Sequence, residues 1–494
     1  MAGKKKHRRK SQSAGKARAR HQGGWRARQS VAPARTGARP PAPGAAAAIA
    51  PIAPAIIATG GEPRADAGAA AVGLAAGLAQ SPPIIRVWRN RNYALFEAGF
   101  TPQNITSWIQ RVGVTWLAWE LSHSNTWVGA VAAADLAPMI VLAPIAGAVT
   151  DRSPNPMRLL MITKLLLLAQ AVALAALALA GLLTIELLFV LSLASGLIQP
   201  YASAARQIIL AASVARTDFA TGIALDSALF QATRFIGPAI AAVMINVWGI
   251  SSTFLAHIGG SALLVASLAC MRVERPDRRG RLRRGILIDV VESVHYVRAH
   301  GAIWPLFMLL TISSMLLRPV QDLLPGFASK VFAAGPEGLG WLASAMGVGA
   351  MISATAIAVR GRAEGLSTWA IVGGLLLVGS TLGFCATDDL RLGLLFAALC
   401  AFSLNTMSTS IQTITQSVVS DDMRGRVMSL YSLIFRGLPA IGAVGLGALA
   451  DGIGLQASFA LAAVMSLLVW LPVASARREI AAALAAEHER PVGS

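Results

Sequence analysis

The stretch Arg272-Val-Glu-Arg-Pro-Asp-Arg-Arg-Gly-Arg-Leu-Arg-Arg284 lies near the middle of a chain that otherwise consists of a succession of apolar segments. Its seven arginines and two acids cannot enter a hydrocarbon core, so the stretch must be a solvated loop. Six apolar segments long enough to cross a membrane lie on either side of it. Because arginine-dense loops stay on the cytoplasmic side, this loop also predicts the orientation of the whole chain.

The composition places the chain among integral membrane proteins. Of its 494 residues, 55% are hydrophobic and 14% are charged, and runs of about 20 apolar residues recur, which is the length of a membrane helix. We therefore expect an all-α integral membrane protein with twelve transmembrane helices in two six-helix bundles. The predicted spans cover residues 93–121, 126–150, 157–181, 184–208, 219–247, 252–271, 303–325, 338–360, 366–386, 391–416, 427–449 and 455–475.

The domain organisation follows from the same pattern. Residues 1–85 are predicted to be a disordered tail, basic at first and then rich in Ala and Pro, because such a segment cannot bury enough surface to offset its ordering entropy. An N-terminal six-helix bundle covers 86–271 and a C-terminal six-helix bundle covers 302–475. Between them, 272–301 form a cytoplasmic basic loop and an amphipathic helix, and 476–494 are a C-terminal tail.

Two of these segments invite a functional interpretation. The basic tail could hold anionic lipid head groups, or it could be dispensable, or be translated from a wrongly chosen start codon. In the segment after the arginine stretch, apolar and polar residues fall on opposite faces at helical spacing, which predicts an interfacial helix. The apolar face contains Leu287, Val290, Val291, Val294 and Val297, and the polar face contains Asp289, Glu292 and Ser293.

Basic residues alternate between the two sides of the predicted spans. With both termini in the cytoplasm, the outer loops hold only Lys330 and Arg391. The cytoplasmic loops hold the central cluster and Arg152, Arg158, Arg206, Arg216, Arg298, Arg360, Arg362, Arg424 and Arg426. This asymmetry holds along all twelve spans, so the predicted orientation does not rest on one loop.

Polar stripes occur in the first, fourth, seventh and tenth spans. Polar side chains inside a span are unfavourable unless they face water or one another, so these four helices are expected to surround a wet cavity. The alternative is interhelical hydrogen bonding without a cavity. The candidate cavity residues are Gln103, Ser107, Gln199, Ser203, Arg318, Asp322, Asn405 and Gln412.

Arg111 and Asp135 are the most enclosed opposite charges of the first half. At about 1.5 Å of rise per residue, both lie well inside antiparallel neighbouring spans and at similar depth. An unpaired charge at that depth would cost about 2.5 kcal/mol or more. We therefore expect them to pair, with Asp135 as the proton-carrying site and Asp226 as the next candidate. The alternative is a fixed structural ion pair.

The loop between the second and third spans reads Gly147-Ala-Val-Thr-Asp151-Arg152-Ser-Pro-Asn-Pro-Met-Arg158. It resembles the signature loop of the major facilitator superfamily, except for Pro154 near the usual second glycine and a single closing basic residue. This resemblance implies a cytoplasmic gate, in which Asp151 docks near the start of the eleventh span. The predicted gate motif comprises Gly147, Asp151, Arg152, Arg158, Arg424 and Arg426.

The segment Asp421-Asp-Met-Arg-Gly-Arg-Val-Met-Ser-Leu430 is a more specific match. Together with Trp108-Ile-Gln-Arg-Val112, it resembles the branch of that superfamily that contains the enterobactin exporter and related transmembrane secretion effectors. The resemblance covers about residues 86–475 and implies a proton-driven exporter that works by alternating access in a bacterial inner membrane. In the fifth span, Arg234, Gly237 and Pro238 resemble the antiporter motif, although alanines replace its paired glycines.

Signals of other functions are missing from the sequence. It has no zinc-hydrolase, nucleophile-elbow or phosphate-loop motif, so we expect no enzyme, cofactor or metal. Cys270, Cys385 and Cys400 lie in apolar runs and give no disulfide framework. His257 is the one histidine within a predicted span, and a structural role is favoured for it over a ligand role.

The favoured function is proton-coupled export of a small molecule, siderophore-like or drug-like, by a monomer in the lipid bilayer that binds no nucleic acid. The alternatives are an importer or lipid-flipping relative of the same fold, and a non-transporting membrane sensor. Arg111, Arg318 and Arg436 suit an anionic or catecholic substrate, whereas Trp108 and Trp116 suit an aromatic one. These residues do not decide between the two.

Overall fold

The computed structural model describes residues 82–272, 286–360 and 365–477. The chain divides into Met1–Gly68 and Ala69–Ser494, and every described residue belongs to the second unit. The basic tail, most of the central arginine stretch and the C-terminal tail lie outside the described residues. The predictions made for those segments therefore stay predictions.

The first half contains six long helices, preceded by the short α2 (Pro83–Arg89). Polar caps set several of their starts, because a side-chain oxygen accepts a hydrogen bond from an otherwise unpaired backbone amide. Asn90, Ser124, Asn155 and Thr184 do this for α3, α4, α5 and α6. The long helices are α3 (Arg91–Ser122), α4 (Asn125–Arg152), α5 (Pro156–Leu179), α6 (Ile185–Ser213), α7 (Phe219–Trp248) and α8 (Ser251–Cys270), with the turn η1 (Arg216–Asp218) before α7.

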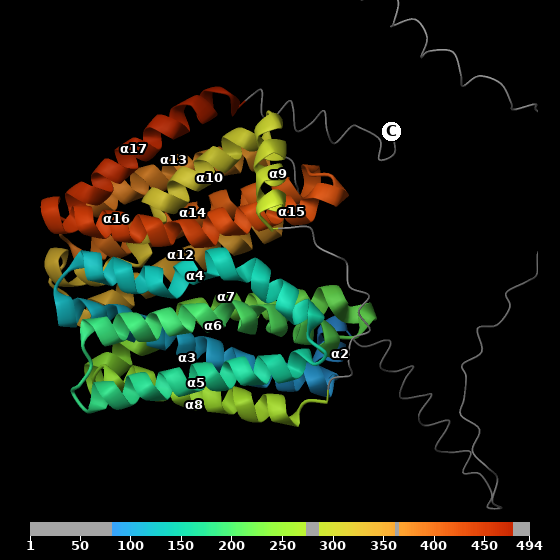
Figure 1. The fold of residues 1–494 in the computed structure, drawn as a ribbon. Coiled ribbons are helices and arrows are strands. Elements are labelled where there is room, and N and C mark those ends of the chain that lie inside the picture. Colours follow the sequence, from blue (N-terminus) through green and yellow to red (C-terminus); the bar gives the residue numbers. More distant parts are fainter. Residues whose placement is uncertain (1–81, 273–285, 361–364, 478–494) are drawn as a thin grey trace, which may run out of the picture. The chain divides into compact units, whose positions relative to one another are not determined.

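The second half begins with α9 (Ile286–Ala299), which is followed by six spans. Its elements are α10 (Ile303–Leu316), η2 (Arg318–Gln321), α11 (Leu324–Gly326), η3 (Phe327–Val331), α12 (Gly335–Arg360), α13 (Leu366–Cys385), α14 (Leu390–Val418), α15 (Asp421–Ser432), η4 (Leu433–Gly437), α16 (Leu438–Ile453) and α17 (Leu455–Ser475). Figure 1 shows the helices of the first half, blue to green, and those of the second half, yellow to red, as two groups.

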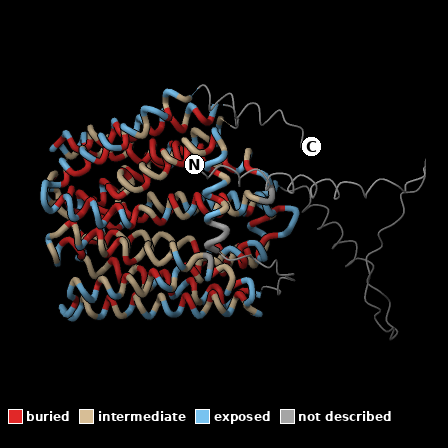
Figure 2. The backbone as a smooth tube through the Cα atoms, turned by 45° about the horizontal axis from the view of Figure 1, so that its top comes forward, coloured by how far each residue is buried: buried red, intermediate tan, exposed pale blue. Residues whose placement is uncertain are grey.

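Eleven segments of the described chain are long and apolar enough to cross a membrane, and the 32-residue helix α3 is the twelfth long element. The predicted fold of twelve membrane helices in two bundles is thus confirmed. Large apolar side chains such as Val141 and Leu468 remain about two-thirds exposed, as expected on surfaces that face lipid. Figure 2 shows buried and exposed positions along the same helices.

The seventh span is not the continuous helix that was predicted over residues 303–325. α10 ends at Leu316 and is followed by a 3₁₀ turn, a short α-helical turn and the π-helical segment η3. Pro319 and Pro325 lack the backbone N–H that a continuing α-helix would need, which explains the breaks. A second π-helical segment, η4, interrupts the eleventh span.

The two halves meet along two pairs of helices, α4 with α16 and α7 with α12. α4 runs from Asn125 to Arg152, and α15–η4–α16 runs from Asp421 to Ile453. Asn125 contacts Asp451, so one end of this helix pair contains both, and we call it the Asp451 end. The opposite end contains Arg152 and Arg426, and we call it the Arg426 end.

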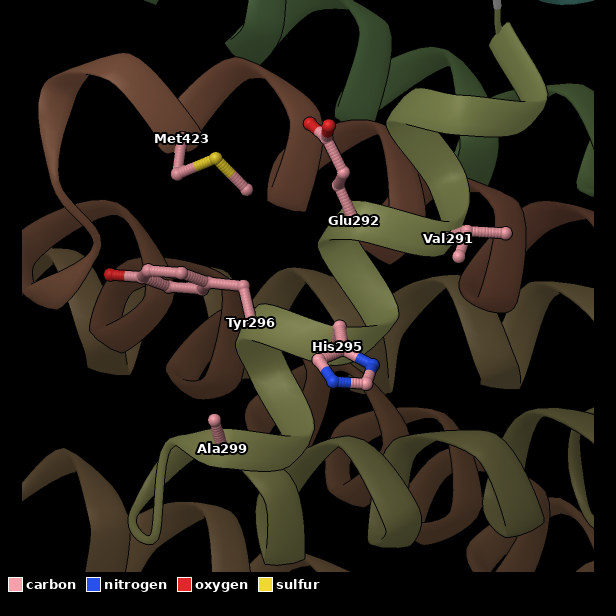
Figure 3. A pocket seen from close by; sticks show the side chains of 6 residues that line it. All are labelled: Val291, Glu292, His295, Tyr296, Ala299 and Met423. Carbon is pink, nitrogen blue, oxygen red and sulfur yellow. The ribbon is translucent and has the colours of Figure 1, made fainter. Parts of the chain in front are cut away.

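Helix α9 lies against α15 and α10 at the Arg426 end. Ser293, predicted on its polar face, is fully buried there, whereas Val291 is 65% exposed. The prediction was wrong for Ser293 because α9 turns Ser293 and Val297 toward the protein and leaves Val291 and Val294 outside. A pocket of about 450 Å³ lies beside it (Figure 3), lined by Val291, Glu292, His295, Tyr296, Ala299 and Met423.

Candidate functional site

The break in the seventh span places polar groups near the middle of that span. Arg318 and Gln321 are the ends of the 3₁₀ turn η2, and Asp322 follows it directly. Irregular backbone at membrane depth is tolerated only where protein surrounds it or where it lines a water-filled space. In transporters, such breaks mark substrate and ion sites.

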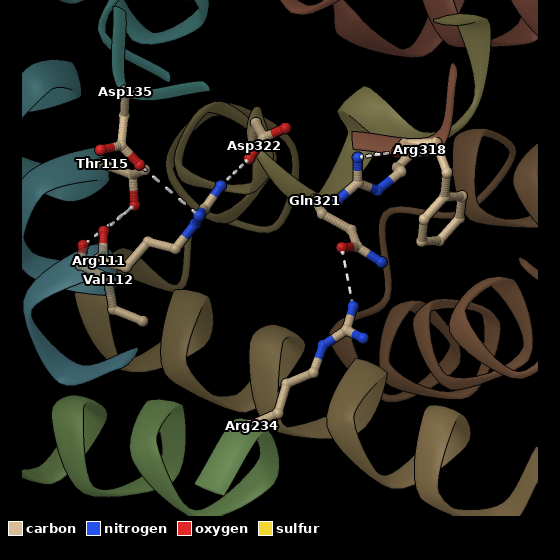
Figure 4. A network of polar contacts seen from close by, with 9 residues as sticks. Arg111, Val112, Thr115, Asp135, Arg234, Arg318, Gln321 and Asp322 are labelled. Atoms are coloured by element: carbon tan, nitrogen blue, oxygen red, sulfur yellow. Dashed lines mark hydrogen bonds and ion pairs between the residues drawn. The ribbon is translucent and has the colours of Figure 1, made fainter. Parts of the chain in front are cut away.

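Arg111 of α3 joins the two halves at this level (Figure 4). Its Nη2 donates a hydrogen bond to Oδ1 of Asp322 at 2.9 Å, and its Nη1 lies 4.0 Å from Oδ2 of Asp135 on α4. Ser195 of α6 donates to the other oxygen of Asp135 at 3.1 Å. The structure thus brings Arg111 near Asp135, and it adds a closer partner from the opposite half that depth alone did not indicate.

These charged side chains differ in their contact with water. The side chains of Arg111 and Asp135 keep 35% and 40% of their surface exposed, whereas Asp322 keeps 8%. Of the two acids in the network, Asp135 therefore keeps the larger exposed surface, although it lies well inside its helix.

Arg318 connects the two irregular segments. Its Nη1 donates to the backbone oxygen of Phe435 at 2.6 Å, and its guanidinium lies 4.9 Å from the centre of the Phe435 ring. Phe435 belongs to the π-helical segment η4, which also holds Arg436, an exposed side chain in the middle of its span. A π-helical turn departs from the regular i to i−4 hydrogen bonds of an α-helix. Here Arg318, from the broken seventh span, donates a hydrogen bond to the backbone oxygen of Phe435 in that turn.

Arg234 of α7 approaches the network from the first half. Its Nη2 lies 3.4 Å from Oε1 of Gln321, a long hydrogen bond, and its guanidinium lies 5.7 Å from the Trp108 ring. Arg111 lies 5.8 Å from the same ring. Gly237, one turn beyond Arg234, permits this arrangement because a Cβ there would collide with Cβ of Trp108. The antiporter-like residues Arg234, Gly237 and Pro238 therefore lie where α7 packs on α3.

The remaining predicted cavity residues are placed in several ways. Gln103 and Ser107 bond to each other within α3 at 2.7 Å. Asn405 donates to α12, at Ala350 and Ser353, which is the interhelical bonding considered as the alternative. Ser203 and Gln412 are half-buried and Gln199 is exposed. The network therefore includes Arg318 and Asp322 from the predicted set, together with Arg111, Asp135, Ser195, Arg234 and Gln321.

The predicted gate residues lie at the Arg426 end. Asp151, Arg152 and Arg158 are exposed, and Gly147 is half-buried. Arg424 donates to the carbonyl of Val419, and Arg426 forms an ion pair with Glu292 of α9.

Asp451 is a functional candidate that the sequence reading missed. Its carboxylate accepts five hydrogen bonds from Ser124, Asn125 and Thr126 at the start of α4, at distances from 2.6 to 2.9 Å. A carboxylate at a helix N-terminus accepts hydrogen bonds from otherwise unpaired amides and interacts favourably with the helix dipole. A repeat could have found it, because Gly447-Ala-Leu-Ala-Asp451 repeats the pattern Gly147-Ala-Val-Thr-Asp151.

A second charged cluster inside the first half was also missed, apart from Asp226. Arg206 was expected in a cytoplasmic loop, but it lies within α6, forms an ion pair with Asp226 of α7 and stacks on Phe96 and Phe100. Lys164 lies 5.5 Å from the Phe100 ring. Buried Glu97, on the same helix as the two rings, completes the cluster. The sequence did contain a signal for this cluster, because its two basic and two acidic side chains lie within predicted spans and can balance one another's charge.

Among the residues that the structure describes, no group of three His, Cys, Asp or Glu side chains could hold a metal ion. The three cysteines are free thiols.

Several solved structures of membrane transporters have a similar fold. A POT family transporter solved with 5-aminolevulinic acid aligns with a TM-score of 0.63 at 13% identity, covering 79% of this chain and 97% of the other. A nucleoside transporter aligns with a TM-score of 0.60 at 14% identity, covering 78% and 99%. The fold is that of the major facilitator superfamily.

The family within this class is given by the sequence match. The chain belongs to the transmembrane secretion effector family, whose model matches residues 89–490. It is 26% identical over 357 residues to the multidrug efflux pump Tap of Mycolicibacterium fortuitum, covering 70% of this chain and 86% of the pump. It is 22% identical over 368 residues to the staphyloferrin A transporter of Staphylococcus aureus, covering 74% and 90%.

Proposed function

We propose that the protein exports a small molecule across a bacterial inner membrane, driven by the proton gradient, through alternating access of the two bundles. The observation that carries this proposal is Arg111, which interacts with Asp135 of the first half and Asp322 of the second. Any change in the charge of one acid alters how strongly Arg111 holds the two halves together. Proton binding and bundle movement are thereby linked.

The coupling step is assigned to Asp135. A proton bound there removes the attraction for one side of Arg111 and leaves Asp322 as its remaining anionic partner. Ser195 can donate to the charged carboxylate and can accept from the protonated one, so it supports both states. The charged groups that act on Asp135 are Arg111 and Asp322, and the balance between them determines when Asp135 takes up the proton.

We assign the Arg426 end to the cytoplasm and the Asp451 end to the outside. The positive-inside rule supports this orientation, since Arg152, Arg158, Arg424 and Arg426 all lie at one end. The hydrogen bonds of Asp451 then hold the outer side closed, and Asp151 is assigned the corresponding role on the cytoplasmic side. The two relatives, by name a multidrug efflux pump and a staphyloferrin A transporter, support a small-molecule substrate.

The test uses proteoliposomes that contain a pH-sensitive dye and carry an imposed pH gradient. Citrate, 2,3-dihydroxybenzoate and ethidium are added in turn, and proton movement and probe movement are recorded together. Opposite flows of proton and probe identify an antiporter, which exports in the cell, whereas flows in the same direction identify an importer.

Asp135→Asn separates coupling from binding. We expect probe binding to survive and gradient-driven transport to fall about tenfold or more, because the variant cannot exchange a proton at this position. Asp388→Asn, an exposed residue bonded to Gln456, is the matched control and should transport normally. A folded Asp135→Asn protein that retains full gradient-driven transport would show that the proton site lies elsewhere, with Asp226 to be tested next.

A further inference from the structure

The central network contains more positive than negative charge. Within the described chain, four arginines meet near the middle of the spans, from α3, α7, the broken seventh span and η4. They are Arg111, Arg234, Arg318 and Arg436, and the acids among them are Asp135 and Asp322. The site therefore carries an excess of two positive charges when both aspartates are ionised.

Both carboxylates interact with a single arginine. Arg111 takes a hydrogen bond to Asp322 and lies within ion-pair distance of Asp135. Arg318 has a backbone oxygen as its hydrogen-bond partner, and Arg234 has the amide oxygen of Gln321 at 3.4 Å. Three guanidinium groups thus lie at this depth without a carboxylate of their own among the contacts described.

The arginines also act on one another. Arg234 lies close enough to Arg111 and Arg436 for their charges to oppose its own, and Arg318 experiences the charges of Arg111, Arg234 and Arg436. Like charges at this depth are unfavourable unless an opposite charge joins them. The missing charge is negative, and the exposed Arg436 and half-buried Arg234 leave room for it to approach.

The aromatic residues position the arginines. The Trp108 ring lies within 6 Å of both Arg111 and Arg234, and the Phe435 ring lies 4.9 Å from Arg318. Such cation–π contacts hold the guanidinium groups in position, and their N–H groups that do not donate to Asp322, Phe435 or Gln321 can donate to an oxyanion. This favours an anionic ligand over an aromatic one, because these rings already have cationic partners.

We propose that the substrate class is a small organic anion with two or more carboxylate or phosphate groups, and that Arg234 and Arg436 select it. The inference rests on the proposed transport function at this same site. It separates the protein from pumps whose substrates are lipophilic cations, which a site with excess positive charge would repel.

The test is binding to the full-length protein in nanodiscs, measured by calorimetry and thermal shift. Citrate, inorganic phosphate and ethidium serve as probes for polycarboxylate, phosphate and lipophilic cation. Citrate or phosphate should bind with an affinity that weakens as salt increases, and ethidium should not bind. The stronger of the two anions identifies the oxyanion that the site prefers.

Arg234→Gln and Arg436→Gln should each weaken anion binding about tenfold, whereas Arg234→Lys should retain much of it because it keeps the charge. Arg391→Gln is the matched control. Arg391 is exposed at the start of α14, a helix that contributes none of the four arginines. Size-exclusion profiles verify that each variant is folded. Ethidium binding without anion binding, or anion binding unchanged in both glutamine variants, would overturn the inference. Proton-coupled movement of ethidium would overturn it while leaving the proposed transport function standing.

Discussion

The two ends of the helix pair α4 and α16 differ in what connects the halves. At the Asp451 end, the carboxylate of Asp451 accepts five hydrogen bonds from Ser124, Asn125 and Thr126, which lie at the start of α4. At the Arg426 end, Arg426 pairs with Glu292 of its own half, and Asp151 is exposed. The same Gly-x-x-x-Asp pattern ends α4 at one side and α16 at the other. The Asp451 end is thus held by a dense set of hydrogen bonds between the halves, whereas the corresponding Asp151 keeps an exposed side chain.

Alternating access gives this asymmetry a physical meaning. If the two contacts cannot form together, each stabilises one state, and their difference in free energy sets the populations. The charged network lies between the two ends, so a proton or substrate that changes it can favour one contact over the other. Substitutions at the ends should therefore shift populations in opposite directions.

The largest effect is expected from Asp451→Asn. The amide keeps the shape, but it replaces one acceptor oxygen by a donor that faces other donors, and it removes the charge that assists the remaining hydrogen bonds. We expect a loss of about 2 kcal/mol for this closed end, or roughly a 30-fold population shift. Spin-label distances across the Asp451 end measure it.

Asp388→Asn at the same end is the control for Asp451→Asn. Asp388 accepts one hydrogen bond, from Gln456 of its own half, so the control should leave the distances unchanged. Equal distance distributions for Asp451→Asn and the parent protein would contradict the assigned role of Asp451.

Gly447→Ala should open the same end by a different route. A Cβ at Gly447 would collide with the backbone oxygen of Asn125, so α16 would have to move away from α4. Overpacking of this kind costs about 1 kcal/mol or more, which corresponds to roughly a fivefold shift. Gly445→Ala is the matched control on the same helix, because a Cβ there meets nothing within 4 Å. Similar shifts for both alanines would point to a helix effect and not to the contact.

Asp151→Asn should act in the opposite direction and less strongly. An exposed carboxylate near a helix N-terminus contributes about 1 kcal/mol or less, so the state with a closed Arg426 end should lose up to about fivefold in population. Labelling rates of single cysteines at that end report the change. No difference from the parent protein in any substrate condition would remove Asp151 from the gate.

Removal of residues 1–85 should have the smallest effect. No predicted span and no network residue lies there, so insertion and transport should stay within twofold of the full chain. Expression in membranes and the proteoliposome assay measure both. A truncated protein that inserts but cannot transport would show that the basic tail takes part in the mechanism.

The spans were largely predictable from the sequence, and the contacts between halves were not. Hydropathy and length gave the ends of most helices within a few residues, because a membrane helix must satisfy its backbone internally. The break after Leu316 was missed although its cause is present in the sequence, because Pro319 and Pro325 lack the backbone N–H of a continuing helix. The partner of Arg111 in the other half depends on how two bundles pack, which no local pattern contains.

Single charges near span ends were the hardest to interpret. Asp451 reads as a solvated loop residue until α4 is placed beside it. Arg206 reads as a loop arginine because its partner Asp226 lies on another helix. The depth argument predicted that Arg111 and Asp135 are level, because it needed only two neighbouring antiparallel helices. In the structure, Nη1 of Arg111 lies 4.0 Å from Oδ2 of Asp135.

The most direct test of alternate closure measures both ends in one protein. In a background with Cys270, Cys385 and Cys400 replaced by serine, spin labels at Trp127 and Ile453 report the Asp451 end, and labels at Val149 and Ser429 report the Arg426 end. All four positions have exposed side chains. Alternate closure predicts that Asp451→Asn lengthens the first distance and shortens the second. Two distances that lengthen together, or a second distance that does not respond, would contradict it.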